Sequence, residues 1–257
     1  METTDQRIEQ LAGAMPPITL DEMKSIRLMN RTDCKYITNM ATLAKLLELT
    51  RTSYYAQVIG EKRVCAYATT YFDTPGTNAM YRQHETGRKP RRKVRVRTYL
   101  ESGISFLEVK EKDNHGKTSK TRVSVPSLES VVNEHSGNEF LQQATGFTFS
   151  DIVPTVSNRF NRITLVNLDK TERLTIDFNI HFHNLVSGED TDMDNIVIVE
   201  LKRDGRVPSP IIPLLRQLRI KPSGFSKYCI GASVTDSSLR ANRFKKRLVK
   251  IRKVAEK

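Results

Sequence analysis

Four basic residues alternate along one short stretch of this 257-residue sequence: Arg91, Lys93, Arg95 and Arg97. Side chains two positions apart point to the same face of a β-strand, so this stretch would present a row of cations on one face. Arg offers a planar fork of donors and Lys a compact charge, and both bind phosphate oxygens. The spacing therefore predicts a strand that binds phosphate groups.

The same alternation recurs in other strand-like stretches. The further members of this charged face are Arg31, Asp33, Lys35, Glu108, Lys110, Lys112, Lys120, Arg122, Arg173, Asp177, Glu200 and Lys202. Most intervening residues are apolar, as at Val94, Val96 and Leu107, which indicates that the opposite face packs against helices. Solvated faces of an open sheet are the alternative. Like charges roughly 7 Å apart repel by about 2 kcal/mol at an effective dielectric near 20, so we favour an interior face filled by a polyanion.

Carboxylates stand among these cations, and we predict Glu200 and Glu108 as metal ligands. Mg²⁺ and Mn²⁺ prefer oxygen ligands and can bridge phosphate groups. The sequence therefore predicts a divalent cofactor, Mn²⁺ or Mg²⁺. A salt bridge from Glu200 to Lys202 or to a neighbouring Arg is the alternative for this carboxylate.

The elements that would position these residues are mostly strands. Strands are expected at residues 31–38, 63–72, 93–101, 104–112, 118–125, 155–168, 173–182 and 195–202, and helices at 20–28, 40–49, 126–143, 210–218 and in the basic tail. So many strands with few helices favour closure, because a closed sheet has no exposed edge. We predict an α+β, mainly β fold: a closed antiparallel eight-stranded β barrel with helices packed outside.

Composition and charge limit the number of domains that the chain can form. With 38% hydrophobic and 28% charged residues, the chain can build a single core. We expect a loosely attached N-terminal segment or helix at 1–30, the barrel at 31–235 and a basic helix or tail at 236–257. Most of the net charge of +13 lies in this tail, so the rest of the chain is only mildly basic. An anion-binding site in the barrel must therefore depend on where its cations lie and not on their number.

No membrane span or secretion signal is visible, and the three cysteines, Cys34, Cys65 and Cys229, are too few and too scattered for a disulfide framework. We therefore predict reduced cysteines and a cytoplasmic protein, with the inner face of the membrane as a further location.

These stretches resemble a known group, the triphosphate tunnel metalloenzymes of the CYTH-like superfamily. Within that group they resemble the polyphosphate polymerase domains of the vacuolar transporter chaperone (VTC) family, in a free-standing bacterial form. The resemblance covers residues 31–231 and rests on RTDCKY at 31–36, YFDT at 71–74 followed by Tyr81-Arg82, KVRVRTY at 93–99, FLEVK at 106–110, RFNR at 159–162, LTIDF at 174–178, IVELK at 198–202 and FSKY at 225–228.

The resemblance implies transfer of the γ-phosphoryl group of ATP to a growing polyphosphate chain, with release of ADP. ATP and inorganic polyphosphate are the implied partners, and a separate membrane protein that receives the product would be a further one. It implies catalytic roles for Lys35, Arg95, Arg97, Lys110, Arg162, Arg173 and Lys227, phosphate contacts by Arg82, Lys112, Lys120, Arg122, Lys202 and Lys221, and a metal on Glu200 and Glu108.

Two positions depart from the family pattern. Phe160 stands where the family often has Tyr, which would remove one phosphate-binding hydroxyl. Gly224 stands where the family tends to have a basic residue, and Lys221 is the substitute that we expect.

Two other functions stay open. Hydrolytic relatives carry Glu-x-Glu-x-Lys on the first strand, whereas this chain has Arg31, Asp33 and Lys35; fewer carboxylates favour a polymerase over a tunnel triphosphatase or a cyclase. A non-enzymatic binder of nucleic acid or anionic membrane is the alternative suggested by the tail, although we expect no specific nucleic acid.

Two motifs are weak. Residues 116–118 read Gly-Lys-Thr but Glu111 stands where a P-loop needs Gly, and His181 and His183 lack a third nearby metal ligand.

Overall fold

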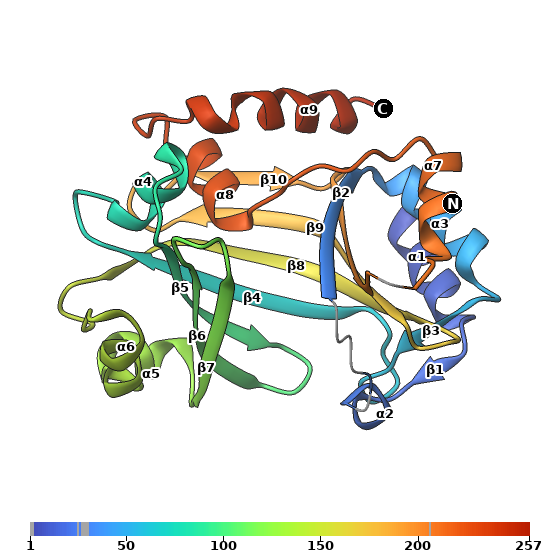
Figure 1. Cartoon of the computed structure of the whole chain (residues 1–257), viewed down its shortest axis with the longest axis horizontal. Coiled ribbons are helices and arrows are strands. Elements are labelled where there is room, and N and C mark those ends of the chain that lie inside the picture. Colours follow the sequence, from blue (N-terminus) through green and yellow to red (C-terminus); the bar gives the residue numbers. More distant parts are fainter. Residues whose placement is uncertain (1–2, 25, 27–30, 206) are drawn as a thin grey trace.

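A single curved antiparallel sheet dominates this computed structural model, which describes residues 3–24, 26, 31–205 and 207–257 (Figure 1). Eight strands follow one another in the order β2-β11-β9-β8-β4-β5-β6-β7. Their bounds are β2 Arg31–Thr38, β4 Cys65–Asp73, β5 Arg91–Tyr99, β6 Ile104–Lys112, β7 Thr118–Val125, β8 Val153–Asn167, β9 Glu172–Asn184 and β11 Val197–Asp204. The shorter strands β1 (Pro17–Ile18), β3 (Tyr54–Gln57) and β10 (Asp190–Met193) pair at its margins.

The sheet is a strongly curled, open half-barrel, so the predicted closed barrel is wrong. Closure would require β2 to pair with β7, but the outer edge of β2 is already occupied by another segment of the chain. The Ser223 N–H donates to the Lys35 carbonyl (2.7 Å), and Tyr36 pairs with Pro222 as an isolated bridge. Because residues 222–223 satisfy this edge, β7 ends the sheet with mostly exposed residues.

The predicted strands agree with the structure to within about two residues, and those at 31–38, 104–112 and 118–125 match it fully. The observed helices are α1 Thr4–Gly13, α2 Leu20–Lys24, α3 Met40–Thr50, α4 Ala79–Thr86, α5 Leu128–Asn133, α6 Asn138–Thr145, α7 Ile211–Gln217, α8 Lys227–Thr235 and α9 Lys245–Ala255. The helix predicted at 126–143 is divided in two, since His135 and Gly137 adopt positive φ between α5 and α6. The end of the helix predicted at 20–28 lies outside the described residues.

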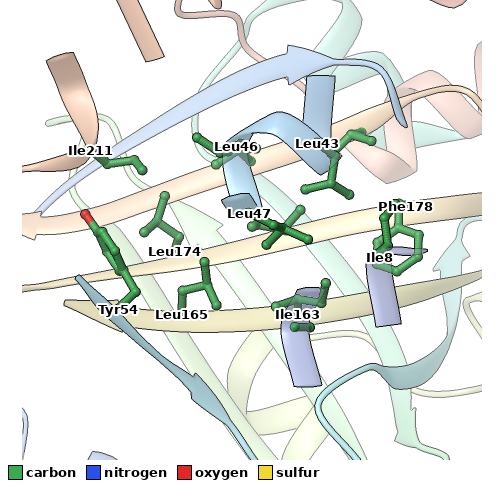
Figure 2. Packing of buried hydrophobic residues seen from close by; sticks show 14 of the residues in the cluster. Ile8, Leu43, Leu46, Leu47, Tyr54, Ile163, Leu165, Leu174, Phe178 and Ile211 are labelled. Carbon is green, nitrogen blue, oxygen red and sulfur yellow. The ribbon is translucent and has the colours of Figure 1, made fainter. Parts of the chain in front are cut away.

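Helices cover the outer face of the sheet at both ends, as predicted. At one end α1, α3 and α7 pack against apolar residues of β8, β9 and β11, including Ile163, Leu165 and Leu174 (Figure 2). At the other end α5 and α6 cover Val94 and Leu107 of β5 and β6. These alternate apolar residues supply the burial that stabilises the sheet, and they leave the charged residues on its inner face.

Helix α1 is part of this core and is not loosely attached. Ile8 and Ala12 are fully buried against α3 and β9, and the Arg7 side chain pairs with Glu48 on α3. The sequence contained a signal for this helix that was not used: Ile8, Leu11, Ala12 and Met15 have the i, i+3, i+4, i+7 spacing of an apolar helix face.

Helix α8 lies against the inner face at one end of the sheet. It begins after Ser226, whose hydroxyl accepts from the Cys229 N–H at 3.2 Å. Gly231 permits close packing on β8 and β9, since a Cβ there would lie 2.5 Å from the Phe182 ring. This seating aims the first residue of the helix, Lys227, at the charged residues of β8 and β9.

Candidate active site

The register of β5, β6 and β7 gathers the predicted cations into rows on the inner face. Lys93 pairs with Lys110, which pairs with Lys120 on β7. Arg95 pairs in the same way with Glu108, and Glu108 with Arg122. We call the inward side of these strands, together with that of β2, β8, β9 and β11, the basic face. Its charged residues are Asp33, Lys35, Arg91, Lys93, Arg95, Arg97, Glu108, Lys110, Lys112, Lys120, Arg122, Arg162, Arg173, Asp177, Glu200 and Lys202, and we include Lys227, which α8 brings to this face.

Glu108 is the counter-charge of the β5–β7 wall. Its carboxylate is 1% exposed, and Arg95 donates to it through Nε at 2.7 Å and through Nη2 at 2.6 Å. Lys120 lies 2.5 Å from its other oxygen. Although burial opposes ionisation, Arg95, Arg97 and Lys120 lower the pKa of Glu108 to about 2. Since both oxygens face cations, metal binding by Glu108 remains a prediction that would require Lys120 to move.

Glu200 has the corresponding place on the opposite wall. It lies on β11 beside Lys35 of β2, and its carboxylate accepts from Lys202 Nζ at 2.5 Å with Lys35 Nζ at 4.0 Å. Burial opposes its charge, yet Lys35 and Lys202 lower the pKa of Glu200 to about 2. The predicted salt bridge between Glu200 and Lys202 is present. The Lys35 side chain stays 36% exposed and can turn toward a ligand.

Asp177 holds two further cations where β8, β9 and α8 meet. Arg162 grips its carboxylate with both ends of the guanidinium, at 2.6 and 2.8 Å, and Lys227 Nζ also donates to it. Burial opposes the charge of Asp177, but Arg162 and Lys227 hold its pKa well below the usual range. Burial lowers the pKa of Lys227 to about 7 against the effect of Asp177. Two strands and a helix thus converge on one ion cluster.

Aromatic rings lie beneath this ion cluster. One of them is Phe160, the residue that departs from the Tyr of the family pattern. Lys227 Nζ lies 4.0 Å from the centre of the Phe160 ring, and the Arg162 guanidinium carbon lies 4.9 Å from that of Tyr67. Arg97 is nearly buried over the same rings, and burial lowers its pKa to about 10. A ring face stabilises such cations, so Phe160 supports them without a hydroxyl.

A cavity of about 360 Å³ opens at one end of the basic face and we call it the entrance cavity. Its charged lining residues are Lys35, Arg91, Lys93, Lys110, Lys112, Arg243 and Arg247. Lys93 donates to Ser226 Oγ at 2.7 Å, and burial, with a smaller effect of Lys35, lowers its pKa to about 8. The alternation placed Arg91 and Lys93 on the predicted phosphate-binding strand, but neither was among the residues assigned an individual role. Arg243 and Arg247 were attributed only to the tail.

Three predicted phosphate ligands lie away from this cluster. Arg82 is exposed on α4, and Lys221 is exposed near α9, where its carbonyl accepts from Lys250 Nζ at 3.4 Å. Arg122 is on the basic face, but it is exposed at the sheet edge with its guanidinium carbon 4.3 Å from the Phe106 ring centre. Arg173, a predicted catalytic residue, pairs with Lys202 at the far end of the face.

The donor set suits a metal shared with phosphate better than an all-protein metal centre. Among the described residues, no three His, Cys, Asp or Glu side chains are grouped to hold a metal ion. His181 and His183 lie with Asp192 and Asp190 on the β9–β10 hairpin, so they have local hydrogen-bond partners. Mg²⁺ is commonly held by one or two carboxylates plus substrate phosphates, and Glu200 is the more accessible of the two predicted ligands.

Comparison with known proteins identifies the family. The profile of the VTC domain matches residues 30–235, which include every strand of the eight-stranded path. The chain belongs to the VTC domain family. A comparison with curated proteins found no match. The three cysteines are free, as expected, and no helix in the described part of this VTC protein has the length and apolar character to cross a membrane.

Two solved structures share the fold. One is a protein from Hippeastrum described as a candidate adenylyl cyclase with dominant triphosphatase activity; it is 14% identical, covers 81% of this chain and 97% of its own, with a TM-score of 0.52. The other is a candidate adenylate cyclase from Bacillus halodurans; it is 14% identical, covers 77% and 96%, with a TM-score of 0.51. The VTC domain of this chain therefore has the CYTH-like, triphosphate tunnel fold.

The Asp177 cluster makes a prediction about stability. Asp177→Asn keeps the side-chain shape but leaves two buried cations without their shared counter-charge, which should cost about 3–5 kcal/mol of unfolding free energy. Urea unfolding at neutral pH measures the loss. Asp21→Asn, which changes a carboxylate in an exposed pair with Lys24, is the matched control and should leave the midpoint unchanged. An equal midpoint for Asp177→Asn and wild type would show that Arg162 and Lys227 do not depend on Asp177.

Proposed function

We propose that this VTC protein is a polyphosphate polymerase that transfers the γ-phosphoryl group of ATP to a polyphosphate chain. The observation that carries the proposal is the imbalance of charge on the basic face. Cations line both of its walls and the entrance cavity, whereas Asp33, Glu108, Asp177 and Glu200 are its only carboxylates among the described residues. Like charges at this density are stabilised when a polyanion lies between them.

The arrangement favours transfer to phosphate over transfer to water. A hydrolase needs carboxylates that hold metal and aim a water molecule, but β2 offers Asp33 alone and places Lys35 next to Glu200. An acceptor that is itself a phosphate chain needs additional cations, and the basic face extends to the entrance cavity to supply them. The face is therefore suited to hold two phosphate chains end to end.

In the proposed reaction, an oxygen of the terminal phosphate attacks the γ-phosphorus of ATP, the bond from that phosphorus to the β–γ bridging oxygen breaks, and ADP leaves with the bond electrons. Such a transfer needs little covalent participation by the protein, because positioning and charge stabilisation supply most of the catalysis. Arg95 and Arg162 are pre-organised for this by their carboxylate partners. Lys35, Lys110 and Lys227 add point charges.

A divalent ion, Mn²⁺ or Mg²⁺, would neutralise phosphate charge when bound. Glu200 would be its main protein ligand, with phosphate oxygens completing the coordination. Glu200 also accepts a hydrogen bond from Lys202 Nζ at 2.5 Å.

The proposal is tested by incubating the protein with ATP and Mn²⁺, with and without a short polyphosphate primer, and measuring ADP, free phosphate and polymer together. ADP matched by polymer is expected. Lys35→Ala removes a half-exposed cation while Lys202 still neutralises Glu200, and should lower kcat by about 10²–10³-fold. Arg159→Ala, an exposed change on the outer face of β8, is the control and should retain activity.

Free phosphate without polymer would contradict the proposal and identify a tunnel triphosphatase. ADP and polymer at wild-type rates in Lys35→Ala would show that the polymerase does not use the basic face.

The buried lysines predict that polyphosphate binding weakens as pH rises. Burial lowers the pKa of Lys227 to about 7 and of Lys93 to about 8, so both are charged below these values and lose charge above them. Internal phosphates stay ionised throughout this range. The dissociation constant should therefore rise at least about tenfold between pH 6.5 and pH 9, since each lost charge-assisted contact is worth about 1.5–3 kcal/mol.

Titration calorimetry with a long polyphosphate measures this change and the protons taken up on binding. Lys93→Arg keeps a charge at high pH and should flatten the upper part of the profile. A dissociation constant that is independent of pH would mean that neither lysine contacts the ligand.

A further inference from the structure

The C-terminal segment lies beyond the residues matched by the family, but it is fixed to the VTC domain. Phe244 and Ile251 are buried in the cluster formed by α8 and the inner face, and Leu248 and Val254 pack against it. The Tyr81 hydroxyl donates to the Arg240 carbonyl at 2.9 Å, at the start of the segment. The Asn195 side chain donates to the Ala255 carbonyl at 2.8 Å, at the end of α9. The position and rotation of α9, which lies across one side of the molecule in Figure 1, are therefore set by contacts along its length.

Two arginines of this segment face the entrance cavity. Arg243 lies in a short 3₁₀ helix, Asn242–Phe244, directly before α9, and Arg247 lies in the first turn of α9. Both line the cavity with Lys93, Lys110 and Lys112. No Asp or Glu lines this cavity among the described residues. Within the same part of the chain, neither arginine has a carboxylate within 4.0 Å. The deeper cations differ from them, since Arg95 and Arg162 are neutralised by Glu108 and Asp177.

Two glycines make room for these arginines. A Cβ at Gly224 would lie 3.4 Å from the Arg247 guanidinium, and one at Gly87 would lie 2.6 Å from that of Arg243. The Arg243 guanidinium thus occupies the space that a side chain at Gly87 would need, and the Arg247 guanidinium lies in contact distance of the backbone at Gly224. Gly224 also directly precedes Phe225 and Ser226, which line the cavity and contact Lys35 and Lys93. Arg247 therefore lies in the corner beside Gly224, whereas Lys221 does not line the cavity.

The remaining cations of α9 do not lie in the entrance cavity. Lys245, Lys246, Arg252 and Lys253 are exposed and do not line the cavity. Lys250 is half-buried, but it donates to the Lys221 carbonyl and does not line the cavity either. Arg243 is itself exposed, so Arg243 and Arg247 differ from these cations in that they line the cavity and not in their burial.

We propose that Arg243 and Arg247 form the outer section of the phosphate-chain site and bind the part of a long chain that extends beyond the sheet. This inference rests on the proposed function only in that the basic face binds phosphate chains. The uncompensated entrance cavity then selects for length: a chain of three phosphates is held by the deeper, paired cations, and a longer chain also reaches the two arginines. The C-terminal helix would thus keep a growing chain attached.

The test compares the double variant Arg243→Ala/Arg247→Ala with the matched pair Lys246→Ala/Lys253→Ala, which removes the same charge from the outer side of α9. Fluorescence competition would give dissociation constants for tripolyphosphate and for a polyphosphate of about a hundred units, without turnover. We expect the cavity-facing pair to raise the long-chain constant about tenfold or more, as the loss of charge-assisted contacts predicts, and to leave that of tripolyphosphate within about twofold. The outer pair should change neither.

Equal weakening by both pairs, or equal weakening for both ligands, would overturn the inference, because the tail would then act only through its net charge. Unfolding midpoints of the variants would show whether the helix stays docked. Failure of the proposed function is a separate result: a wild-type protein that binds long polyphosphate but forms no polymer refutes the polymerase and leaves the binding test intact.

A rescue variant separates a lost cation from a disturbed helix. Arg247→Ala opens the space beside Gly224, whose φ lies outside the left-handed region and accepts a side chain. Gly224→Lys in the Arg247→Ala background should return most of the long-chain affinity, and Gly224→Leu in the same background should not. Equal affinities of these two double variants would contradict a role for a cation at this corner.

Discussion

The cost of placing many like charges on one inner face is the constraint on which the rest of the structure depends. Three carboxylates of the basic face each neutralise two cations at once: Glu108 faces Arg95 and Lys120, Glu200 faces Lys202 and Lys35, and Asp177 faces Arg162 and Lys227. Such pairs add little net stability when buried, but they hold guanidinium and ammonium groups in fixed positions. The fold is stabilised elsewhere, by the apolar outer face and its helices, and this leaves the inner face for binding.

The open shape of the sheet follows from the same arrangement. A closed barrel would bring Lys120 and Arg122 of β7 next to Lys35 with no strand between them. Instead, the segment at residues 222–225 lines the edge of β2 and then enters the inner face as α8. This route delivers Lys227 to Asp177 and Phe225 to Lys35, so one segment caps the sheet edge and completes the ion cluster. The open side becomes the entrance cavity, where charge is not compensated.

Much of the face could be predicted because it depends on local alternation. A strand of the type KVRVR specifies which residues point inward regardless of what it pairs with, so the assignments of Arg95, Lys110 and Glu200 to one face needed no tertiary information. Closure could not be predicted in this way, since it depends on which segment reaches the edge of β2. The outward position of Arg82 is set by the orientation of α4 on the sheet, which periodicity does not specify.

The C-terminal segment is a second case in which the sequence pattern does not predict which residues the fold brings together. Its charge indicated only a basic tail, because nothing local relates Arg247 to Gly224 or Arg243 to Gly87. The fold brings Arg247 of the tail beside Gly224, although the two residues belong to separate sequence patterns. Likewise, Phe160 reads as a missing hydroxyl in the sequence but is the ring that supports Lys227 in the structure.

The most direct measurement of the central claim is a crystal structure of the protein with tripolyphosphate. If the basic face is a phosphate-chain site, phosphate density will lie between the β5–β7 wall and the β2–β11 wall, within hydrogen-bond distance of Arg95, Arg162 and Lys227. Density only on the outer face of the sheet, or only along the exposed side of α9, would contradict the account and leave the inner cations as a structural feature without a ligand.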